Sequence, residues 1–242
     1  SHPSQLHILH VGRNDDAGCF YYVMELADRA EREKEECRMR NETAPPGGTS
    51  SFDLLTSYFP RTLRHDILHR GRLPFDECLR IGLALATALD HLHRHGLVHR
   101  DVKPSNIIFI EGIPKLADIG LVAQAEATLS MVGTEGYVPP EGPGTPQADL
   151  FSLGKVLYEM ATGRDRQEYP ELPTNLVEQG PAEMERMTEL NEIILRVCQP
   201  DPRQRYQTAA ELHADLALLQ SGKSVTRMRA MERRLRRVAR AG

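Results

Sequence analysis

The stretch that decides the fold is VHRDVKPSN, residues 98–106. It places Lys103 two residues and Asn106 five residues after Asp101. A carboxylate can accept a proton, an ammonium group offsets negative charge, and an amide oxygen is a hard ligand that suits Mg²⁺. Alone, a His-Arg-Asp triplet on a polar loop is commonly a solvated ion pair, so the rest of the sequence has to decide its meaning.

Four more stretches follow in order: LADIGL (116–121), GTEGYVPPE (133–141), DLFSLG (149–154) and DPRQR (201–205). Together with VHRDVKPSN, they resemble the successive motifs of the C-terminal lobe of serine/threonine protein kinases, of the bacterial eukaryotic-like type. Five motifs with family-like order and spacing leave little room for coincidence. The resemblance implies transfer of the ATP γ-phosphate to protein Ser or Thr hydroxyls.

The resemblance also implies the catalytic and metal-binding residues. Asp101 would accept the substrate hydroxyl proton, and Lys103 would lie beside the transferred phosphoryl group. Asn106 and Asp118 would hold Mg²⁺, an amide oxygen from one loop and a carboxylate from another. Ile119 replaces the usual Phe after that Asp and keeps an apolar side chain available to pack beneath His99.

Four other residues of these motifs are expected to have supporting contacts. Thr134 should approach Asp101 and Lys103. Asp149 should hold the backbone of the catalytic loop, and Arg205 should be the buried partner of Glu141. Between Asp118 and Glu141 we expect activating phosphorylation at Thr128 or Ser130, with Arg100 as the residue that pairs with the phosphate.

The stretch YYVMELAD, residues 21–28, resembles the strand and hinge that hold the adenine ring. Met24 would gate the pocket, Glu25 and Ala27 would offer backbone groups to the base, and Ile108 would form the pocket floor. An apolar strand with a Met otherwise indicates core, so the downstream motifs carry this interpretation. The implied cofactors are ATP and Mg²⁺.

Periodicity predicts the elements around these motifs. Clustered β-formers predict a hairpin over residues 6–26, and two short β runs flank Glu111 and Gly112. Apolar residues at helical spacing predict helices over 76–96 and 149–163, and Thr208 with Glu211 has capping-box spacing ahead of a helix through Leu219. The expected fold class is mainly α (α+β): a kinase-like C-terminal helical lobe with a small β remnant of the N-terminal lobe.

Composition shifts divide the chain into four parts. Residues 1–27 would be remnant N-lobe strands and hinge, 28–57 a charged, Pro- and Gly-rich insertion, 58–220 the C-lobe, and 221–242 a basic tail. No G-x-G-x-x-G occurs in the sequence, and Lys34 falls too late to be the family's strand Lys. The resemblance therefore implies that the sequence begins at the last two strands of the N-lobe.

Global composition indicates an ordinary globular domain. The 242 residues are 40% hydrophobic and 26% charged, and no apolar run is long enough to cross a bilayer. The four cysteines lie far apart, which suggests reduced thiols and a cytoplasmic location. The net charge of −4 is uneven, because the tail carries eight basic residues against Glu232, +7 in all, and leaves −11 on the body.

Three alternatives accompany this interpretation. His91 and His95 have the i, i+4 spacing of a metal pair, but no Cys or carboxylate clearly completes a site, so we interpret them as a helix end. The basic tail is a solvated helix or a juxtamembrane segment facing the cytoplasmic side of a membrane. The whole domain is a kinase, with ATP and a protein substrate but no nucleic acid as partners, or a pseudokinase scaffold without efficient transfer.

Overall fold

The structure is a computed structural model, and it describes residues 8–14, 19–30, 58–117, 123–124, 134–173, 180–231 and 234. Within these residues the chain is mainly helical, with three two-stranded antiparallel pairs. The fold class predicted from the sequence is therefore confirmed. The predictions that concern residues 31–57, Asp118, Ile119, Thr128 and Ser130 fall outside the described residues.

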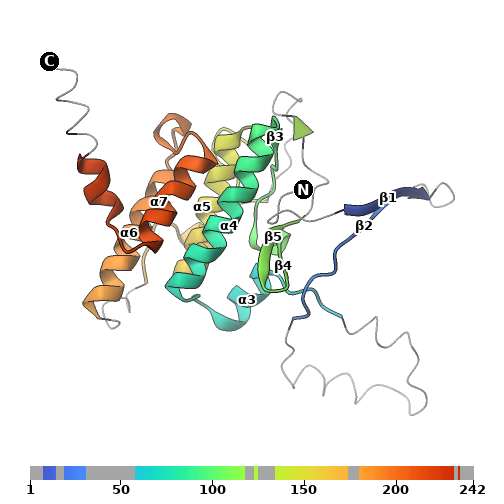
Figure 1. Cartoon of the computed structure of the whole chain (residues 1–242), viewed down its shortest axis with the longest axis horizontal. Coiled ribbons are helices and arrows are strands. Elements are labelled where there is room, and N and C mark those ends of the chain that lie inside the picture. The colour runs from blue at the N-terminus through green and yellow to red at the C-terminus, as the bar shows by residue number, and fades with distance from the viewer. Residues whose placement is uncertain are drawn as a thin grey trace, which may run out of the picture.

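The helical body is built on α4, Phe75–Arg94, which packs against both α5, Pro146–Thr162, and α7, Ala209–Gln220 (Figure 1). Ile81, Leu85 and Leu89 are fully buried one turn apart along α4. Burial of a stripe at this spacing is what packs an amphipathic helix onto its neighbours. The long helix expected over residues 76–96 is thus confirmed, and the chain turns away from it at Gly96, whose φ is +70°.

Both ends of α5 carry the expected signals. The Thr145 hydroxyl accepts a hydrogen bond from the Ala148 N–H, and Gly163 follows the helix in the left-handed conformation. Gly154 lies against α6, Pro181–Val197, and a Cβ there would be 2.3 Å from Val197 Cγ1. Only glycine allows these two helices to approach so closely.

Two helices were not predicted from the sequence: α3, Leu63–Arg70, and α6. Both had local signals. Thr62 caps α3 by accepting from the His65 N–H, and Gly71 ends it. Pro181 at the first turn of α6 precedes buried apolar residues at helical spacing: Met187, Leu190, Ile193, Ile194 and Val197.

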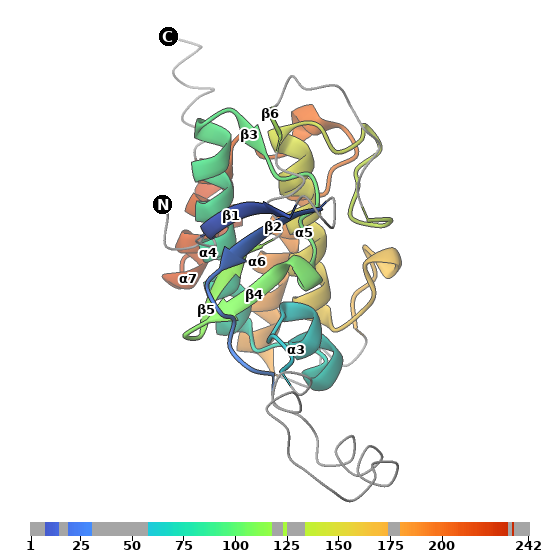
Figure 2. The ribbon, with the colours of Figure 1, turned by 90° about the vertical axis from the view of Figure 1, so that its right-hand side faces the viewer.

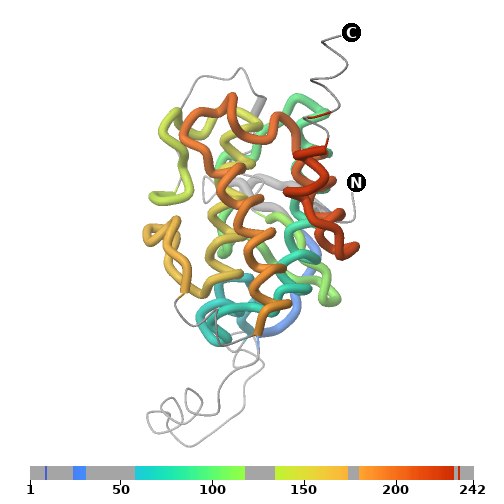
Figure 3. The backbone as a smooth tube through the Cα atoms, turned by 90° about the vertical axis from the view of Figure 1, so that its left-hand side faces the viewer, coloured from blue at the N-terminus to red at the C-terminus, as the bar shows by residue number. Residues whose placement is uncertain are grey.

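The prediction for α7 is confirmed. The Thr208 hydroxyl accepts from the Glu211 N–H, and the Glu211 carboxylate accepts from the Gln207 N–H, so the cap operates in both directions. Residues 225–231 then form a further helix, in line with the helical alternative considered for the basic tail. Figure 3 shows the chain from the side on which α6, α7 and this tail helix lie.

The β part consists of short pairs beside the helices. β1, Ile8–Asn14, pairs with β2, Cys19–Met24, and the resulting ribbon projects from the helical body (Figures 1 and 2). β4, Ile107–Ile110, pairs with β5, Ile113–Leu116, as predicted. The elements that remain are β3, Leu97–Val98, paired with β6, Ala123–Gln124, and the short 3₁₀ turns Pro104–Asn106, Arg166–Glu168 and Pro202–Gln204.

Candidate active site

The loop between β3 and the Pro104–Asn106 turn is held by one buried carboxylate. Asp149, in the first turn of α5, accepts hydrogen bonds from the backbone N–H groups of His99 and Arg100, each at 2.8 Å. It also accepts from His93 Nε2 at 2.9 Å. The expected role of Asp149 in holding this backbone is confirmed, and the three donors satisfy the hydrogen-bonding capacity of one buried carboxylate.

His93 is a contact that the sequence analysis missed. It belongs to the cluster of histidines at the end of α4, and its ring lies in the interior against Asp149 rather than at the surface. The i, i+3 and i, i+4 spacing of α4 places His93 near the buried face, and this spacing could have predicted that the ring is buried. The rings of its neighbours His91 and His95 contact each other in a tilted arrangement, with centroids 4.4 Å apart.

His99 joins the catalytic loop to the end of β5. Its buried ring contacts the Ala117 carbonyl through Nε2 at 2.9 Å, which assigns the ring proton to that nitrogen. Ala117 immediately precedes Asp118 in the chain, so this hydrogen bond ties the strand end that leads to Asp118 to the loop that carries Asp101.

Asp101 lies at the centre of a compact group of polar side chains. Its carboxylate is 6% exposed and lies 2.6 Å from Lys103 Nζ. Thr134 Oγ1 donates to Asp101 Oδ1 at 2.9 Å, and Lys103 Nζ donates to Thr134 Oγ1 at 2.8 Å. The predicted approach of Thr134 to both residues is confirmed, and it brings together side chains more than thirty residues apart.

The surroundings of Asp101 keep it ionised. Burial acts to raise its pKa, but hydrogen bonds from Lys103 and Thr134 and the Lys103 charge outweigh burial, and the pKa is lowered from its ordinary value. At neutral pH the carboxylate is therefore a charged hydrogen-bond acceptor. Such an acceptor orients a hydroxyl group strongly but has little tendency to take its proton before the reaction begins.

Asn106 is oriented by the same carboxylate. Its Nδ2 donates both to the Asp101 carbonyl and to Asp101 Oδ2, at 2.9 Å each. The donor to Asn106 Oδ1 within the described residues is Ser105 Oγ at 3.5 Å, a weak contact. The amide oxygen, a hard ligand, is thus left for a cation. Asp118, the second predicted ligand, lies outside the described residues.

The segment after Thr134 is fixed to α5. The Tyr137 hydroxyl donates to the buried Glu159 carboxylate, and burial and this hydrogen bond raise the Tyr137 pKa. Arg166 approaches the other Glu159 oxygen, and its guanidinium lies over the Tyr137 ring, 4.7 Å from the centroid. These contacts hold the chain next to Thr134 in place.

Glu141 and Arg205 form the predicted ion pair. Two guanidinium nitrogens of Arg205 donate to the two carboxylate oxygens of Glu141, at 2.5 and 2.9 Å. The Arg205 side chain is fully buried and also donates to the carbonyls of Gln147, Gln199 and Pro200. A buried, bidentate and fully bonded guanidinium makes this a structural anchor between the 133–141 segment and the turn before α7.

The predicted adenine-binding residues lie at the end of β2 and on β4. Met24 ends β2 and is 41% exposed, whereas Ile108 is 6% exposed and packs with Ala27 and Ala117. The Ala27 carbonyl accepts a hydrogen bond from the Tyr58 hydroxyl at 2.5 Å. The structure thus places Ala27 and Ile108 together and leaves Met24 at the surface.

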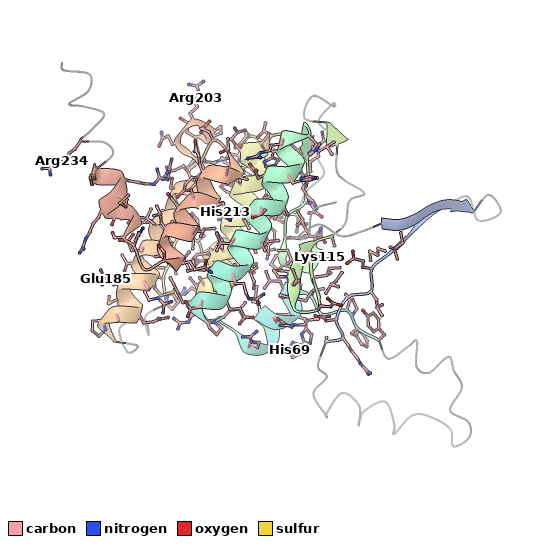
Figure 4. All side chains as sticks on the ribbon, in the orientation of Figure 1. His69, Lys115, Glu185, Arg203, His213 and Arg234 are labelled. Atoms are coloured by element: carbon pink, nitrogen blue, oxygen red, sulfur yellow. The ribbon has the colours of Figure 1, made fainter. Side chains whose placement is uncertain are left out.

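A lysine that the sequence analysis did not assign binds the hinge. Lys115 on β5, labelled in Figure 4, is buried, and its Nζ lies 2.5 Å from the Glu25 carboxylate. Nothing in the sequence indicated this partner, because Glu25 is 90 residues away from Lys115. The side chain of Glu25 is therefore engaged with β5, a contact separate from the backbone role predicted for it.

Asp28 extends this attachment. Its carboxylate accepts from the N–H groups of Glu111 and Gly112, each at 2.8 Å, at the β4–β5 turn. Both turn residues have positive φ, 53° and 73°, which matches a tight type I′ hairpin. Asp28 thereby caps the turn and connects the end of the hinge to the pocket-floor strand.

The described residues show neither a metal cluster nor a membrane span. No group of three or more His, Cys, Asp or Glu side chains among them is arranged to hold a metal ion, and no helix there is long and apolar enough to cross a bilayer.

Cys78 and Cys198 are free and buried, and burial raises the pKa of each to about 12. These two thiols are therefore protonated at neutral pH.

The loop, its anchors and the helical lobe define a protein kinase domain, and the comparison with known families agrees. The family model described as "Protein kinase domain" matches residues 48–216, more than half of the chain. The chain therefore belongs to the protein kinase family, and its relatives are bacterial serine/threonine-protein kinases.

Three relatives illustrate the similarity. A probable serine/threonine-protein kinase of Clostridium perfringens is 31% identical over 93% of this chain and 31% of its own length. The kinase PknB of Mycobacterium leprae is 34% identical over 66% of this chain and 29% of its own. For PrkC of Bacillus subtilis the values are 31%, 64% and 27%. The chain spans about a third of the length of these relatives.

Proposed function

We propose that this chain carries the catalytic loop of a serine/threonine protein kinase, which transfers the γ-phosphoryl group of ATP to a Ser or Thr hydroxyl of a protein. The observation that supports this most directly is the buried, ionised Asp101 bonded to Lys103, Thr134 and Asn106. A carboxylate held in this way accepts a hydroxyl proton, and a neighbouring ammonium group meets the charge of a phosphoryl group. One site thus holds the groups for both parts of the transfer.

Asp101 orients the substrate hydroxyl and receives its proton. The Thr134 hydroxyl already donates a hydrogen bond to Asp101 Oδ1, so the carboxylate can accept a hydrogen bond from a hydroxyl in this geometry. The substrate oxygen forms a bond to the γ-phosphorus, the bond from that phosphorus to the β–γ bridging oxygen breaks, and its electron pair leaves with ADP. Because the Asp101 pKa is low, we propose that the proton reaches it late, when the new P–O bond is largely formed.

Lys103 supplies positive charge where negative charge spreads over the phosphoryl oxygens. Its Nζ is fixed by Asp101 and Thr134 on two sides, at 2.6 and 2.8 Å, and has a third donor for a phosphate oxygen. A donor that is already in place needs no reorganisation as the reaction proceeds. We therefore assign Lys103 to stabilising the transferred group.

Asn106 and Asp118 are the proposed Mg²⁺ ligands. The fit rests on Asn106, whose Nδ2 is committed to two Asp101 oxygens and whose Oδ1 is left for a hard cation. When bound, Mg²⁺ neutralises charge on the ATP phosphates. This chain's own part is to hold the Asn106 amide in the orientation that presents its oxygen.

For the adenine ring we propose the hinge, with backbone groups of Glu25 and Ala27 facing the base, Ile108 beneath it and Met24 at the entrance. The packing of Ala27 against the buried Ile108 supports a shared apolar surface there.

We also propose a cytoplasmic location, with the basic tail facing a membrane surface. A protein substrate is proposed from the chemistry of Asp101 and from the names of the relatives.

The test replaces Asp101 by Asn in the longest protein that contains these residues. Phosphate transfer from labelled Mg·ATP to a generic protein should fall by about 10²–10⁴-fold, because the proton acceptor is lost while the shape is kept. ATP affinity by calorimetry and the circular dichroism of the folded protein should change little, whereas the melting temperature should fall because Lys103 loses its charged partner. Arg203→Gln, a change at an exposed residue far along the chain, is the matched control.

Wild-type turnover in Asp101→Asn would contradict the assignment of Asp101. A wild-type protein that binds Mg·ATP without transferring phosphate would instead support the pseudokinase alternative.

A further inference from the structure

A single carboxylate on α6 holds the start of the basic tail. Glu189 Oε1 accepts from the hydroxyls of Ser224 and Thr226, both at 2.6 Å. Glu189 Oε2 accepts from the backbone N–H groups of Val225 and Thr226, at 2.9 and 3.1 Å. The tail helix of residues 225–231 thus begins on Glu189, beyond residue 216, where the match to the kinase family ends.

A second set of contacts fastens the same helix to α7. Arg229 forms an ion pair with the buried Asp215, with Nε 2.7 Å from Oδ2, and its guanidinium lies over the ring of Tyr206. Asp215 also accepts from the Tyr206 hydroxyl at 2.6 Å, and Val225 is 3% exposed. The tail helix is therefore docked by apolar burial and by two acidic anchors, Glu189 and Asp215.

The contact at Glu189 depends on hydrogen bonds that the tail donates to its carboxylate. Burial alone would raise the pKa of Glu189, but the hydrogen bonds from Ser224, Thr226 and the two N–H groups lower it. The carboxylate is therefore charged at neutral pH, and all of its partners here are donors. Thr226 is exposed, and Ser224 is only partly buried.

We propose that Thr226 is a phosphorylation site, and that a phosphate on it releases the tail helix from α6 and α7. The proposal rests on the proposed function for its chemistry. Thr226 Oγ1 forms a bond to the γ-phosphorus of ATP, the bond to the β–γ bridging oxygen breaks, and the hydroxyl proton passes to Asp101 of a second copy. A second copy is required because the tail helix lies on the far side of the helical body from β4 and β5 (Figure 1).

A phosphate on Thr226 turns its attractive contact with Glu189 into a repulsive one. A phosphothreonine carries about −1.5 to −2 charges at pH 7 and only accepts hydrogen bonds. It would stand beside Glu189 in place of a hydroxyl donor 2.6 Å from Oε1, so one attraction is removed and a like-charge repulsion is added. The phosphate and the Glu189 carboxylate would be at hydrogen-bond distance, where like charges repel strongly. We expect this repulsion to exceed the attraction between the phosphate and the N-terminus of the short tail helix.

The same phosphate competes for the second anchor. Arg229 is three residues beyond Thr226 and so lies on the same face of the tail helix. A guanidinium binds phosphate in bidentate geometry, so Arg229 would pair with the new phosphate at the expense of Asp215. Release would free the segment that carries the exposed Arg234, which is labelled in Figure 4, from the helical body.

The release is tested by installing phosphothreonine at position 226 and measuring the rate of tryptic cleavage after Arg229, with hydrogen exchange over residues 225–231. Both rates should rise by about tenfold or more, since hydrogen bonds to a charged group are lost. In Glu189→Gln, the amide can donate to the phosphate, and the increase caused by phosphate should fall to about twofold or less. An equal increase in both backgrounds, or none in the wild type, would overturn the release mechanism.

A pair of variants matched in size but different in charge needs no chemical modification. Thr226→Asp and Thr226→Asn both lose the hydroxyl and have nearly the same size, and only the first adds negative charge. Cleavage should be faster in Thr226→Asp. Equal rates in the two variants would show that charge at this position does not act on the docked helix.

The modification itself is tested by incubating the longest protein that contains these residues with Mg·ATP and locating phosphate by mass spectrometry, with Asp101→Asn as control. Phosphate at Thr226 in the active protein and not in the control supports the assignment. A protein that phosphorylates a generic substrate but leaves Thr226 unmodified would overturn it while the proposed function stands. Failure of all transfer would instead contradict the proposed function.

Discussion

The catalytic loop and the hinge both carry proposed functional groups, but the fold holds them by different means. Asp149 fixes the catalytic loop from the interior through two hydrogen bonds to its backbone and a third to His93 on α4, all to residues about fifty positions away. The hinge is attached by the Lys115–Glu25 ion pair and the Asp28 cap, while Met24 and Leu26 beside them are 41% and 74% exposed. The loop is thus part of the core, and the hinge is fastened to its edge.

This difference has an energetic consequence. A buried carboxylate with three donors is expensive to disturb, because any donor left behind is desolvated and unpaired. A group near the surface can exchange a lost partner for water. We therefore expect changes in the loop to affect global unfolding and changes in the hinge to affect local opening.

The largest effect is expected for Asp149→Ala. Two backbone N–H groups and His93 Nε2 would lose their acceptor inside the protein, so the free energy of unfolding should fall by about 3–5 kcal/mol. Urea unfolding followed by circular dichroism measures this. Asp90→Asn breaks the helix-surface pair with Arg94 and should cost no more than about 0.5 kcal/mol. Similar losses of unfolding free energy in the two variants would contradict the distinction between buried contacts and surface contacts.

A smaller, pH-dependent effect is expected for Lys103→Met. The Asp101 pKa is lowered in the folded protein, so its stabilisation is present above the unfolded pKa and is lost as the pH falls through the folded pKa. Removing Lys103 takes away an important cause of that lowering. The variant should therefore lose about 1.5–3 kcal/mol at neutral pH.

The measurement for Lys103→Met is the unfolding free energy of wild type and variant from pH 7 down to pH 3. The difference between them should shrink toward acid pH, because protonated Asp101 no longer needs the ammonium group. A constant difference across this range would mean that Lys103 acts on stability through packing alone.

The smallest global effect is expected at the hinge. Lys115→Met should lower the unfolding free energy by about 1 kcal/mol or less, since the Met side chain fills the buried space of Lys115 and the partly exposed Glu25 carboxylate can regain water. Hydrogen exchange at residues 24–28 should become faster. Adding Glu25→Gln to this variant should bring little further change, because the pair is already broken. A loss as large as that of Asp149→Ala would place the hinge in the same cooperative unit as the loop.

Local sequence was a good guide wherever one segment carries its own signal. The long helix with buried Leu85 and Leu89, the tight turn at Glu111 and Gly112, and the cap of Thr208 were all predicted from spacing and turn chemistry. The two unpredicted helices, α3 and α6, also carried caps and apolar spacing that pattern reading could have used. The predicted contacts of Thr134, Asp149 and Arg205 came from the family resemblance.

The sequence by itself therefore determined the helical body, the class of protein and the residues expected around Asp101, because motif order and periodicity are local properties of the chain. Only the tertiary structure decided that His93 reaches Asp149, that Lys115 binds Glu25, and that Glu189 holds the tail. Each of these contacts joins residues 35 or more positions apart. Such partners depend on which faces are buried together, and no single segment encodes that choice.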